Sequence, residues 1–246
     1  MSGQNSEKLN TTTKPVHIAF IMDGNGRWAK KRGLPRTFGH DAGTKTLEKI
    51  INCCFDRGIE YITFYAFSTE NWSRPKNEVD HLMKLFESYL DYLIKKTEGS
   101  TSGIYALTRL RFIGDLTVLS NRVQEKIGLL EKRSMFGPRS MTLSIAVNYG
   151  GRDDIVHAVN RLIESGNRTK ITAEDISANL FTRELPDPDL IIRTGGEMRL
   201  SNFLLWQAAY TEFYSTHVLW PDFSGEDLDK AISDFSSRER RFGNIK

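Results

Sequence analysis

Apolar residues along the chain follow two different spacings. Short runs rich in β-branched and aromatic residues, bounded by turn residues, are typical of buried strands. Six such runs are present, at residues 16–22, 61–67, 110–113, 141–147, 190–193 and 213–219. Between most of them, apolar residues recur at helical spacing, as in 47–54, 82–93 and 155–163. This alternation predicts an α/β fold: a single domain with a mostly parallel six-stranded sheet flanked by helices.

Polar stretches mark the expected loops and the start of the domain. Residues 68–77 and 97–105 are polar, and the second stretch contains several glycine and serine residues, so both predict surface loops. Residues 1–14 are also polar and are expected to form a disordered N-terminus. Residues 15–246 then make up one domain.

The composition is that of a globular protein. Of the 246 residues, 39% are hydrophobic and 26% are charged, which suffices for a packed core. A net charge of +3, from 34 basic and 31 acidic residues, gives no general case for binding nucleic acid. The only two cysteines, Cys53 and Cys54, are adjacent and fit a reducing cytosol. There is no signal-peptide core and no run of about 18 apolar residues. We therefore expect a soluble cytoplasmic protein, with peripheral membrane contact left open.

The first predicted strand ends in a segment suited to binding phosphate. Met22 is followed by Asp23-Gly24-Asn25-Gly26-Arg27, and a helix is expected to start near Trp28. Ligands of open α/β sheets bind beyond the carboxyl ends of the strands. Backbone amides and Arg27 can hold a phosphate there, and Asp23 can hold a divalent metal ion. A plain strand-to-helix turn with Asp23 as its cap is an equally good interpretation.

Two further segments carry polar side chains in comparable positions. Arg36 and His40 can converge on the same anion, although His40 can also simply hydrogen-bond near a helix start. The second strand is followed by Ser68, and the residues from there to Arg74 have the composition of a lid. A capped turn with Trp72 packed on the core is the structural alternative.

The fifth strand delivers Arg193 directly into a glycine turn, with Arg199 and Ser201 close behind. Two arginines, a hydroxyl group and glycine amides favour a second diphosphate-binding site. A charge on such an apolar strand needs a partner, so a purely structural interpretation is weaker here. Glu212 precedes the last run and is a candidate metal ligand, although a solvated strand end is the more common role for such a residue.

Taken together and in this order, these segments resemble the cis-prenyltransferases of the undecaprenyl and dehydrodolichyl diphosphate synthase type. The resemblance runs from about His17 to Gly243, nearly the whole chain. It includes three further motifs: Asn148-Tyr149-Gly150-Gly151-Arg152, Asn202-Phe203-Leu204-Leu205-Trp206-Gln207 and Leu219-Trp220-Pro221-Asp222-Phe223. No single motif is decisive, but their combination is highly specific.

The resemblance implies a role for each candidate residue. Asp23 is implied to be the essential metal-binding carboxylate, and Glu212 to help place the metal. The residues implied to hold the allylic diphosphate are Gly24, Asn25, Gly26, Arg27, Trp28, Arg36 and His40. Those implied to hold isopentenyl diphosphate are Arg193, Arg199 and Ser201. The site and its closing lid would include Phe67, Ser68, Glu70, Asn71, Trp72 and Arg74. Arg241 and Gly243 would reach into the site of a partner subunit.

The resemblance also implies the reaction and its requirements. Isopentenyl diphosphate would be condensed, with Mg²⁺, onto an allylic diphosphate such as farnesyl diphosphate. The product would be a long cis-polyprenyl diphosphate, such as undecaprenyl diphosphate, that grows into an apolar tunnel walled by the helix at 82–93. The proton released can be taken by a diphosphate oxygen, by His40 through Ser68, or by Asn71 with water. The protein would act as a homodimer.

Three alternatives remain at this point. The chain can be one subunit of a heteromeric cis-prenyltransferase, but such partner subunits lose the diphosphate-binding residues that are present here. It can instead be a synthase of shorter chains, because the polar stretch at 97–105 is longer than in compact bacterial members and leaves product length open. Binding of nucleic acid through Lys30-Lys31-Arg32 and Arg238-Glu239-Arg240-Arg241 is less well supported, since solvated helix faces explain both clusters.

Overall fold

The computed structural model describes residues 14–99, 103–135, 140–166 and 170–238. Six strands form one sheet in the order β3-β4-β2-β1-β5-β6, and every neighbouring pair is parallel. The strands are β1 (His17–Ile21), β2 (Tyr61–Ser68), β3 (Thr108–Ile113), β4 (Met141–Tyr149), β5 (Leu190–Arg193) and β6 (Glu212–Ser215). The predicted six-stranded α/β fold is confirmed.

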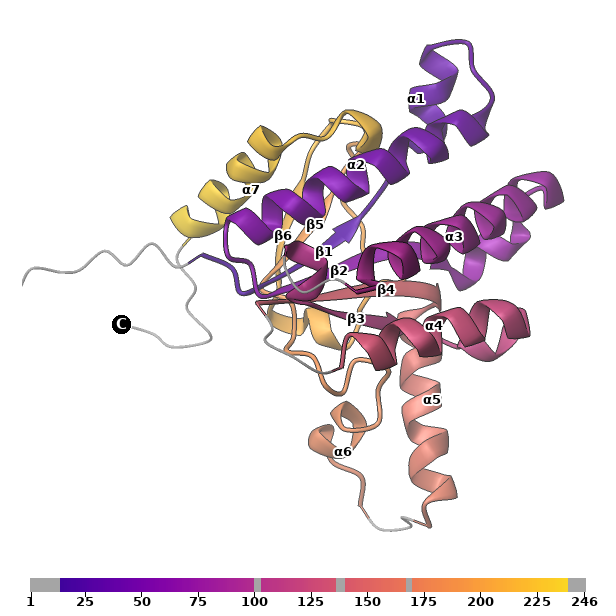
Figure 1. The fold of residues 1–246 in the computed structure, drawn as a ribbon. Coiled ribbons are helices and arrows are strands. Elements are labelled where there is room, and N and C mark those ends of the chain that lie inside the picture. The colour runs from indigo at the N-terminus through magenta and orange to yellow at the C-terminus, as the bar shows by residue number, and fades with distance from the viewer. Residues whose placement is uncertain (1–13, 100–102, 136–139, 167–169, 239–246) are drawn as a thin grey trace, which may run out of the picture.

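Helices cover both faces of the sheet. Those of the described residues are α1 (Asn25–Lys31), α2 (Arg36–Asp56), α3 (Lys76–Thr97), α4 (Asn121–Arg133), α5 (Gly151–Glu164), α6 (Ala173–Ser177) and α7 (Gly225–Ser237). Figure 1 shows α2, α3, α4 and α7 on one side of the sheet and α5 and α6 on the other. In the part of the chain that the structure describes, no helix is long and apolar enough to cross a membrane.

Alternate side chains of the same strands build two separate cores. In β1, Ile18 and Phe20 pack into the core that α2, α3, α4 and α7 share. Ala19 and Ile21 face the opposite side and pack with Phe203 in a second core. Burial of both faces explains why β1 and β5 are apolar along almost their whole length.

The strand order brings the carboxyl ends of β1 and β5 together. β1 lies between β2 and β5, and Ile21 is opposite Arg193 in the register. The chain continues to β2 on one side of β1 and later reaches β5 on the other, so the strand order reverses here. A ligand crevice forms at such a switch point in open α/β sheets. Two segments predicted separately to bind diphosphates therefore meet at one place.

The carboxyl end of β2 is irregular. Its pairing with β4 shifts register between Tyr65 and Phe67, and again between Phe67 and Ser68. Bulges of this kind redirect side chains and are frequent next to active sites. The residue skipped in the pairing, Ala66, lines both of the cavities described below.

Some sequence-based boundaries were wrong. β6 ends at Ser215 instead of 219, because this edge strand is only partly buried and the chain then turns so that the Val218 carbonyl accepts a hydrogen bond from Gly195. α1 begins at Asn25 rather than near Trp28, since Gly24 adopts a left-handed conformation and starts the helix directly after the strand. The predicted loop at 68–77 is largely a 3₁₀ helix, η1 (Thr69–Ser73), followed by the start of α3.

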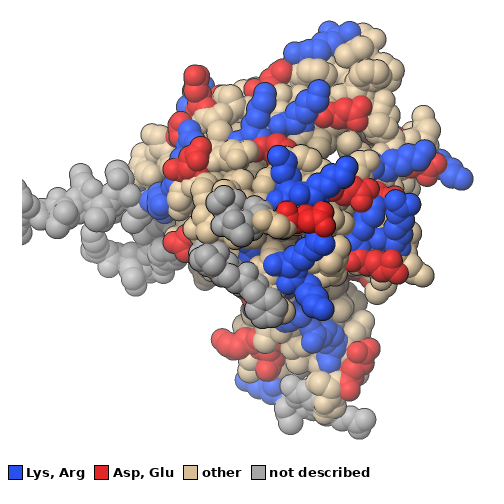
Figure 2. Space-filling view, in the orientation of Figure 1, with Lys and Arg blue, Asp and Glu red and all other residues tan. Residues whose placement is uncertain are grey.

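Basic and acidic side chains are interspersed over the molecular face seen in Figure 2. Lys126 of α4, for example, pairs with Glu87 and Asp91 of α3 at 2.9 and 2.8 Å. Of the N-terminal stretch expected to be disordered, residues 1–13 lie outside the described part. Lys14 donates hydrogen bonds to the Arg57 and Gly58 carbonyls.

Candidate active site

Asp23 lies between two arginines where β1 and β5 end. Its Oδ2 accepts a hydrogen bond from Arg193 Nη2 at 2.9 Å, and its Oδ1 is 3.0 Å from Arg27 Nη2. Burial acts to raise the pKa of Asp23, but the hydrogen bonds from Arg193 and Arg27 outweigh it and lower the pKa. The N-cap position of α1 is occupied by Gly24, which has no side chain to cap the helix. Asp23 is thus an ionised, partly exposed carboxylate in a cationic setting and does not act as a helix cap.

Arg193 connects Asp23 to the segment that follows β5. Its Nη1 donates to Ser201 Oγ at 2.7 Å and to the Arg199 carbonyl at 2.5 Å. The side chain is only 5% exposed, and its Nε is buried with no hydrogen-bond partner among the described residues. A buried donor left without a partner is costly and calls for an explanation such as a ligand. The Nε–H of Arg193 is therefore a donor that none of the described residues satisfies.

The glycine turn after β5 closes this cluster. Arg27 Nη1 donates to the Gly195 carbonyl at 2.6 Å. Gly195 has φ of +84°, and a Cβ at this position would collide with the Arg27 guanidinium. Glycine is required here both for its backbone conformation and for the close approach. The turn thus brings the arginine that follows β1 against the end of β5.

Three predicted site residues converge on Glu78, in the first turn of α3. Arg36 Nε and Arg74 Nη1 each lie 3.1 Å from this carboxylate, and His40 Nε2 lies 3.2 Å from it. Glu78 is 6% exposed. Burial acts to raise its pKa, but the hydrogen bonds from His40 and Arg36 outweigh this effect and lower it. One buried carboxylate therefore offsets the mutual repulsion of two arginines.

His40 is held mainly in its neutral form. Burial lowers the pKa of His40, while the hydrogen bond to Glu78 opposes the shift without reversing it. A neutral imidazole can accept a proton at neutral pH, which keeps His40 a candidate general base.

The residues after β2 form a capped turn, as the structural interpretation of this segment predicts. The side chains of Ser68 and Asn71 make a capping box around η1. Trp72 packs edge-on against Phe67 with ring centroids 4.9 Å apart, and its Nε1 donates to Asn148 Oδ1 at 2.8 Å. Ser68 and Asn71 nevertheless line the same cavity as Asp23. The turn and the site are therefore built from the same residues.

Two cavities meet at this edge of the sheet. The first, here called the polar cavity, is lined by Asp23, Ser68, Asn71, Arg74, Arg193 and Ser201, among others. The second, here called the apolar cavity, lies between α2 and α3 and is lined largely by apolar side chains. The two share Met22, Asn25, His40, Ala66 and Leu82. A molecule with a charged head and an apolar tail can therefore occupy both at once.

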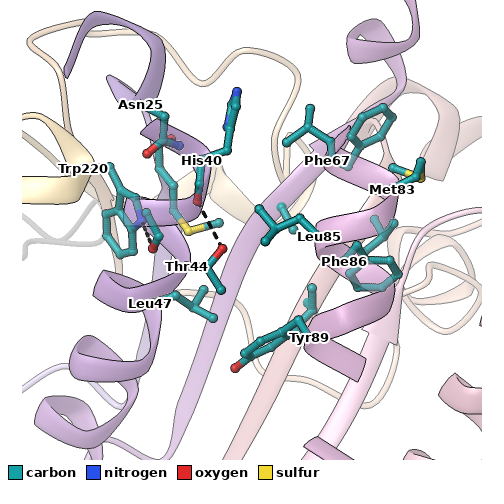
Figure 3. A pocket seen from close by; sticks show the side chains of 16 residues that line it. Asn25, His40, Thr44, Leu47, Phe67, Met83, Leu85, Phe86, Tyr89 and Trp220 are labelled. Atoms are coloured by element: carbon teal, nitrogen blue, oxygen red, sulfur yellow. Dashed lines mark hydrogen bonds between the residues drawn. The ribbon is translucent and has the colours of Figure 1, made fainter. Parts of the chain in front are cut away.

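The apolar cavity ends at Tyr89. Figure 3 shows α2 contributing His40, Thr44 and Leu47 to one wall, and α3 contributing Met83, Leu85, Phe86 and Tyr89 to the other. The Tyr89 hydroxyl points away from the cavity and donates to Glu48 at 2.5 Å. The same carboxylate accepts hydrogen bonds from Tyr92 at 3.1 Å and from Tyr105. We call these four residues the Glu48 cluster.

Several predicted site residues lie elsewhere. Glu212 occupies the first position of β6, at the opposite end of the strand from the site, where it pairs with Arg238 at 2.7 Å. Trp28 donates to Asp222 at 2.6 Å and lies beneath the Arg32 guanidinium. The Arg199 side chain is 63% exposed and pairs with Glu197. Arg241 and Gly243 lie outside the described residues. Within one chain, the structure does not bring the side chains of Glu212, Trp28 and Arg199 to Asp23.

Sequence reasoning missed Glu78 and Asn202. Glu78 follows Arg74 by four residues, a spacing at which opposite charges often pair, so this one contact could be predicted from the sequence. Its contacts with Arg36 and His40 join residues about 40 positions apart and depend on the packing of α3 against α2. Asn202 donates to Glu70 Oε1 at 2.8 Å across 132 residues, a contact that no local pattern reveals.

The donor set fits Mg²⁺ only together with a substrate. No group of three or more Asp, Glu, His or Cys side chains that could hold a metal occurs within the described ranges. Mg²⁺ is commonly bound by one or two carboxylates, water and substrate phosphates rather than by an all-protein cage. Asp23, ionised and lining the polar cavity, is the carboxylate suited to that role.

Comparison with known proteins identifies the family. Residues 21–243 match the family described as "Putative undecaprenyl diphosphate synthase". The chain belongs to this family of prenyltransferases. The match confirms the predicted resemblance and the predicted class of enzyme, a synthase of cis-prenyl diphosphates.

Individual relatives agree with this assignment. The chain is 51% identical to an isoprenyl transferase of Fusobacterium nucleatum, covering 94% of this chain and 97% of that one. It is 50% identical to an isoprenyl transferase of Clostridium perfringens, covering 94% and 91%. The structure of lavandulyl diphosphate synthase from Lavandula x intermedia, in complex with dimethylallyl diphosphate, superposes with a TM-score of 0.86 at 38% identity, covering 94% and 99%. That of a "probable undecaprenyl diphosphate synthase" from Campylobacter jejuni gives 0.77 at 36%, covering 94% and 100%.

Proposed function

We propose that this prenyltransferase condenses isopentenyl diphosphate onto an allylic diphosphate, with farnesyl diphosphate as the starter, and makes a long cis-polyprenyl diphosphate such as undecaprenyl diphosphate. The observation that carries this proposal is that the polar cavity and the apolar cavity adjoin and share five lining residues. An allylic diphosphate is a charged head joined to an apolar tail and matches both compartments. The dimethylallyl diphosphate bound in the lavandulyl diphosphate synthase structure supports an allylic diphosphate as one substrate.

The two diphosphates would occupy neighbouring positions. Arg36, His40 and Arg74, with Asn25, would hold the allylic diphosphate, because they gather where the two cavities join. Arg193 and Ser201 would hold isopentenyl diphosphate, since both line the polar cavity and Arg193 Nη1 donates to the Ser201 hydroxyl. Arg199, exposed beside them, would complete this second group on binding.

The residues match the charges that develop in the reaction. The allylic C–O bond breaks, and the diphosphate leaves with the bonding electron pair. The double bond of isopentenyl diphosphate then forms the new C–C bond, and a proton is lost from the adjoining carbon. Arginine side chains stabilise the departing diphosphate. His40, Ser68 and Asn71 line the polar cavity. These residues and a diphosphate oxygen are the candidate acceptors for the proton.

Asp23 would hold Mg²⁺ together with diphosphate oxygens. When bound, the metal ion supplies positive charge that neutralises the diphosphate groups. Asp23 also lies between Arg27 and Arg193 and pairs with both, so it fixes the position of each guanidinium group. Its position between β1 and β5 thus links the allylic and isopentenyl positions.

The growing chain would extend along the apolar cavity toward Tyr89. Apolar side chains form most of the cavity wall between α2 and α3. Contact with a prenyl tail would remove their apolar surface, and that of the tail, from water, which is favourable. At Tyr89, the tail would meet the Glu48 cluster, in which three tyrosine hydroxyl groups donate hydrogen bonds to one carboxylate. Separating such groups is costly, so the cluster would end the tunnel.

The assembly would be a homodimer in the cytoplasm, with peripheral contact to a membrane where the product leaves. The tail at Arg241 and Gly243 would complete the site of the neighbouring subunit. The presence of Asp23, Arg27, Arg36 and Arg193 together in one cluster favours a catalytic chain over a non-catalytic partner subunit.

Incubation of the purified protein with labelled isopentenyl diphosphate, farnesyl diphosphate and Mg²⁺ tests this function. We expect a ladder of products longer than farnesyl diphosphate, with cis geometry in the added units, and no ladder in the presence of a chelator. A protein that makes no condensation product alone, but does so with an added partner, would support the heteromeric alternative and contradict this proposal.

A further inference from the structure

The segment after Arg199 has an unusual backbone. Ser201, Asn202 and Leu204 have positive φ angles of 50°, 62° and 45°. Asparagine tolerates this region, but a bulky residue such as leucine rarely adopts it. Backbone strain of this kind persists only where surrounding contacts enforce it, and it is concentrated at functional sites. The contacts that hold residues 201–204 in this conformation are therefore candidates for a functional role.

Asn202 makes three of those contacts. Its backbone carbonyl accepts a hydrogen bond from the Gly151 amide at 2.6 Å, and its Oδ1 accepts one from the Arg152 amide at 2.9 Å. These amides belong to the first turn of α5, where helical N–H groups have no partner within the helix. Its Nδ2 donates to Glu70 Oε1, in η1, at 2.8 Å. One side chain thus joins the segment after β5 to the first turn of α5 and to the turn after β2.

The neighbouring Gly150 leaves room for this junction. A Cβ at Gly150 would lie 2.7 Å from Asn202 Nδ2 and 2.8 Å from Thr69 Oγ1. Thr69 in turn donates to Asp153 Oδ2 at 3.0 Å. The absence of a side chain at position 150 is therefore what allows these polar groups to come together.

Ser201 is the residue directly before Asn202, and its hydroxyl receives the Arg193 hydrogen bond at 2.7 Å. Resting on the proposed function, we propose that Asn202 is a positioning residue for isopentenyl diphosphate. It locks the strained 201–204 segment onto α5 and Glu70, and so holds the Ser201 hydroxyl against Arg193. Glu70, assigned above to the site and its lid, then acts through Asn202.

Exchange of the hydrogen-bonding groups tests this inference. Asn202→Asp keeps the acceptor for the Arg152 amide but places a carboxylate opposite Glu70. We expect it to raise the KM for isopentenyl diphosphate by roughly tenfold, as for loss of a hydrogen bond to a charged group, and the KM for farnesyl diphosphate by less than about twofold. Adding Glu70→Gln restores a donor–acceptor pair with the roles reversed. The double variant should return the KM for isopentenyl diphosphate to within about twofold of wild type.

Asn202→Gly is the second variant, because glycine keeps the left-handed backbone while both side-chain hydrogen bonds are lost. It should raise the same KM, and Glu70→Gln should not rescue it. Asn179→Gly, outside the site, is the matched control and should leave both KM values unchanged. Thermal unfolding of each variant checks the fold. Equal effects on both substrates, or no rescue by the exchange, would overturn the inference.

The outcome can be separated from that of the proposed function. If the wild-type protein makes no product, the proposed function fails, and the positioning role is measured instead by calorimetric binding of inorganic diphosphate. Weaker binding to Asn202→Asp, restored by Glu70→Gln, would then support the role. Unchanged binding would contradict it.

Discussion

At the scale of single residues, each cation of the site has an anionic partner before any substrate is present. Arg27 and Arg193 share Asp23, whereas Arg36 and Arg74 share Glu78. Each of the two carboxylates is likewise paired, and its partners lower its pKa although burial acts to raise it. The arginines are therefore held in place by charge pairs that a diphosphate can join or exchange.

This arrangement makes Asp23→Ala a demanding test of the metal assignment. The variant should lose activity by about 100-fold or more, because a ligand is removed where charge develops. Asp222→Ala is a matched control, since Asp222 pairs with Arg32 and Trp28 at an exposed position. Initial rates at several Mg²⁺ concentrations are the measurement. Near-normal turnover of Asp23→Ala that still requires Mg²⁺ would argue against this role for Asp23.

At the scale of elements, α2 and α3 form the walls of the apolar cavity, and the Glu48 cluster ties them together at its far end. Glu48 belongs to α2, Tyr89 and Tyr92 to α3, and Tyr105 to the short 3₁₀ helix η2 (Ile104–Ala106) that follows α3. The polar stretch at 97–105, which left product length open in the sequence, is thus anchored at the end of the cavity through Tyr105.

Tyr89→Ala should lengthen the products. The truncation opens the end of the cavity, while both diphosphate positions lie on other segments, so the first condensation should persist. Loss of a buried aromatic side chain costs roughly 3–5 kcal/mol of stability, and folding must be confirmed by thermal unfolding. Tyr89→Phe keeps the ring and should leave the product ladder unchanged. Identical product ladders from the wild type and a folded Tyr89→Ala protein, at equal rates, would show that the Glu48 cluster does not control chain length.

Elements and their order could be predicted from the sequence, and their detailed ends could not. The buried strands were readable because β1 and β5 are apolar on both faces. The predicted β6 is too long because Val218 is apolar. In the structure, Val218 does pack against the core, but it belongs to an irregular segment that follows the strand. Asp23 and Arg193 were identified separately, and their direct contact follows only from the pairing of β1 with β5. The convergence on Glu78 depends on tertiary packing that periodicity does not encode.

At the scale of the whole molecule, the two cavities join at the switch point of the sheet, and the proposed dimer would complete the site with Arg241 of the neighbour. Mixing Asp23→Ala subunits with Arg241→Ala subunits should therefore restore activity. In a mixed dimer, one site has both its own Asp23 and an intact Arg241 from its neighbour.

The matched control for this mixing experiment replaces the Arg241→Ala subunits with subunits that carry both substitutions. No intact site can then form, and activity should remain absent. Subunit exchange is verified with differently tagged chains. A monomer in sedimentation, or no recovery despite proven exchange, would count against the shared site.

The central claim is that the polar cavity holds the diphosphate head and the apolar cavity holds the prenyl tail of the same molecule. A crystal structure with an unreactive thiolo analogue of farnesyl diphosphate measures this directly. We predict that the diphosphate lies beside Asn25, Arg36 and His40, with the tail between α2 and α3 and its end directed toward Tyr89. A tail that leaves the site by another route, with the cleft between α2 and α3 empty, would contradict the account.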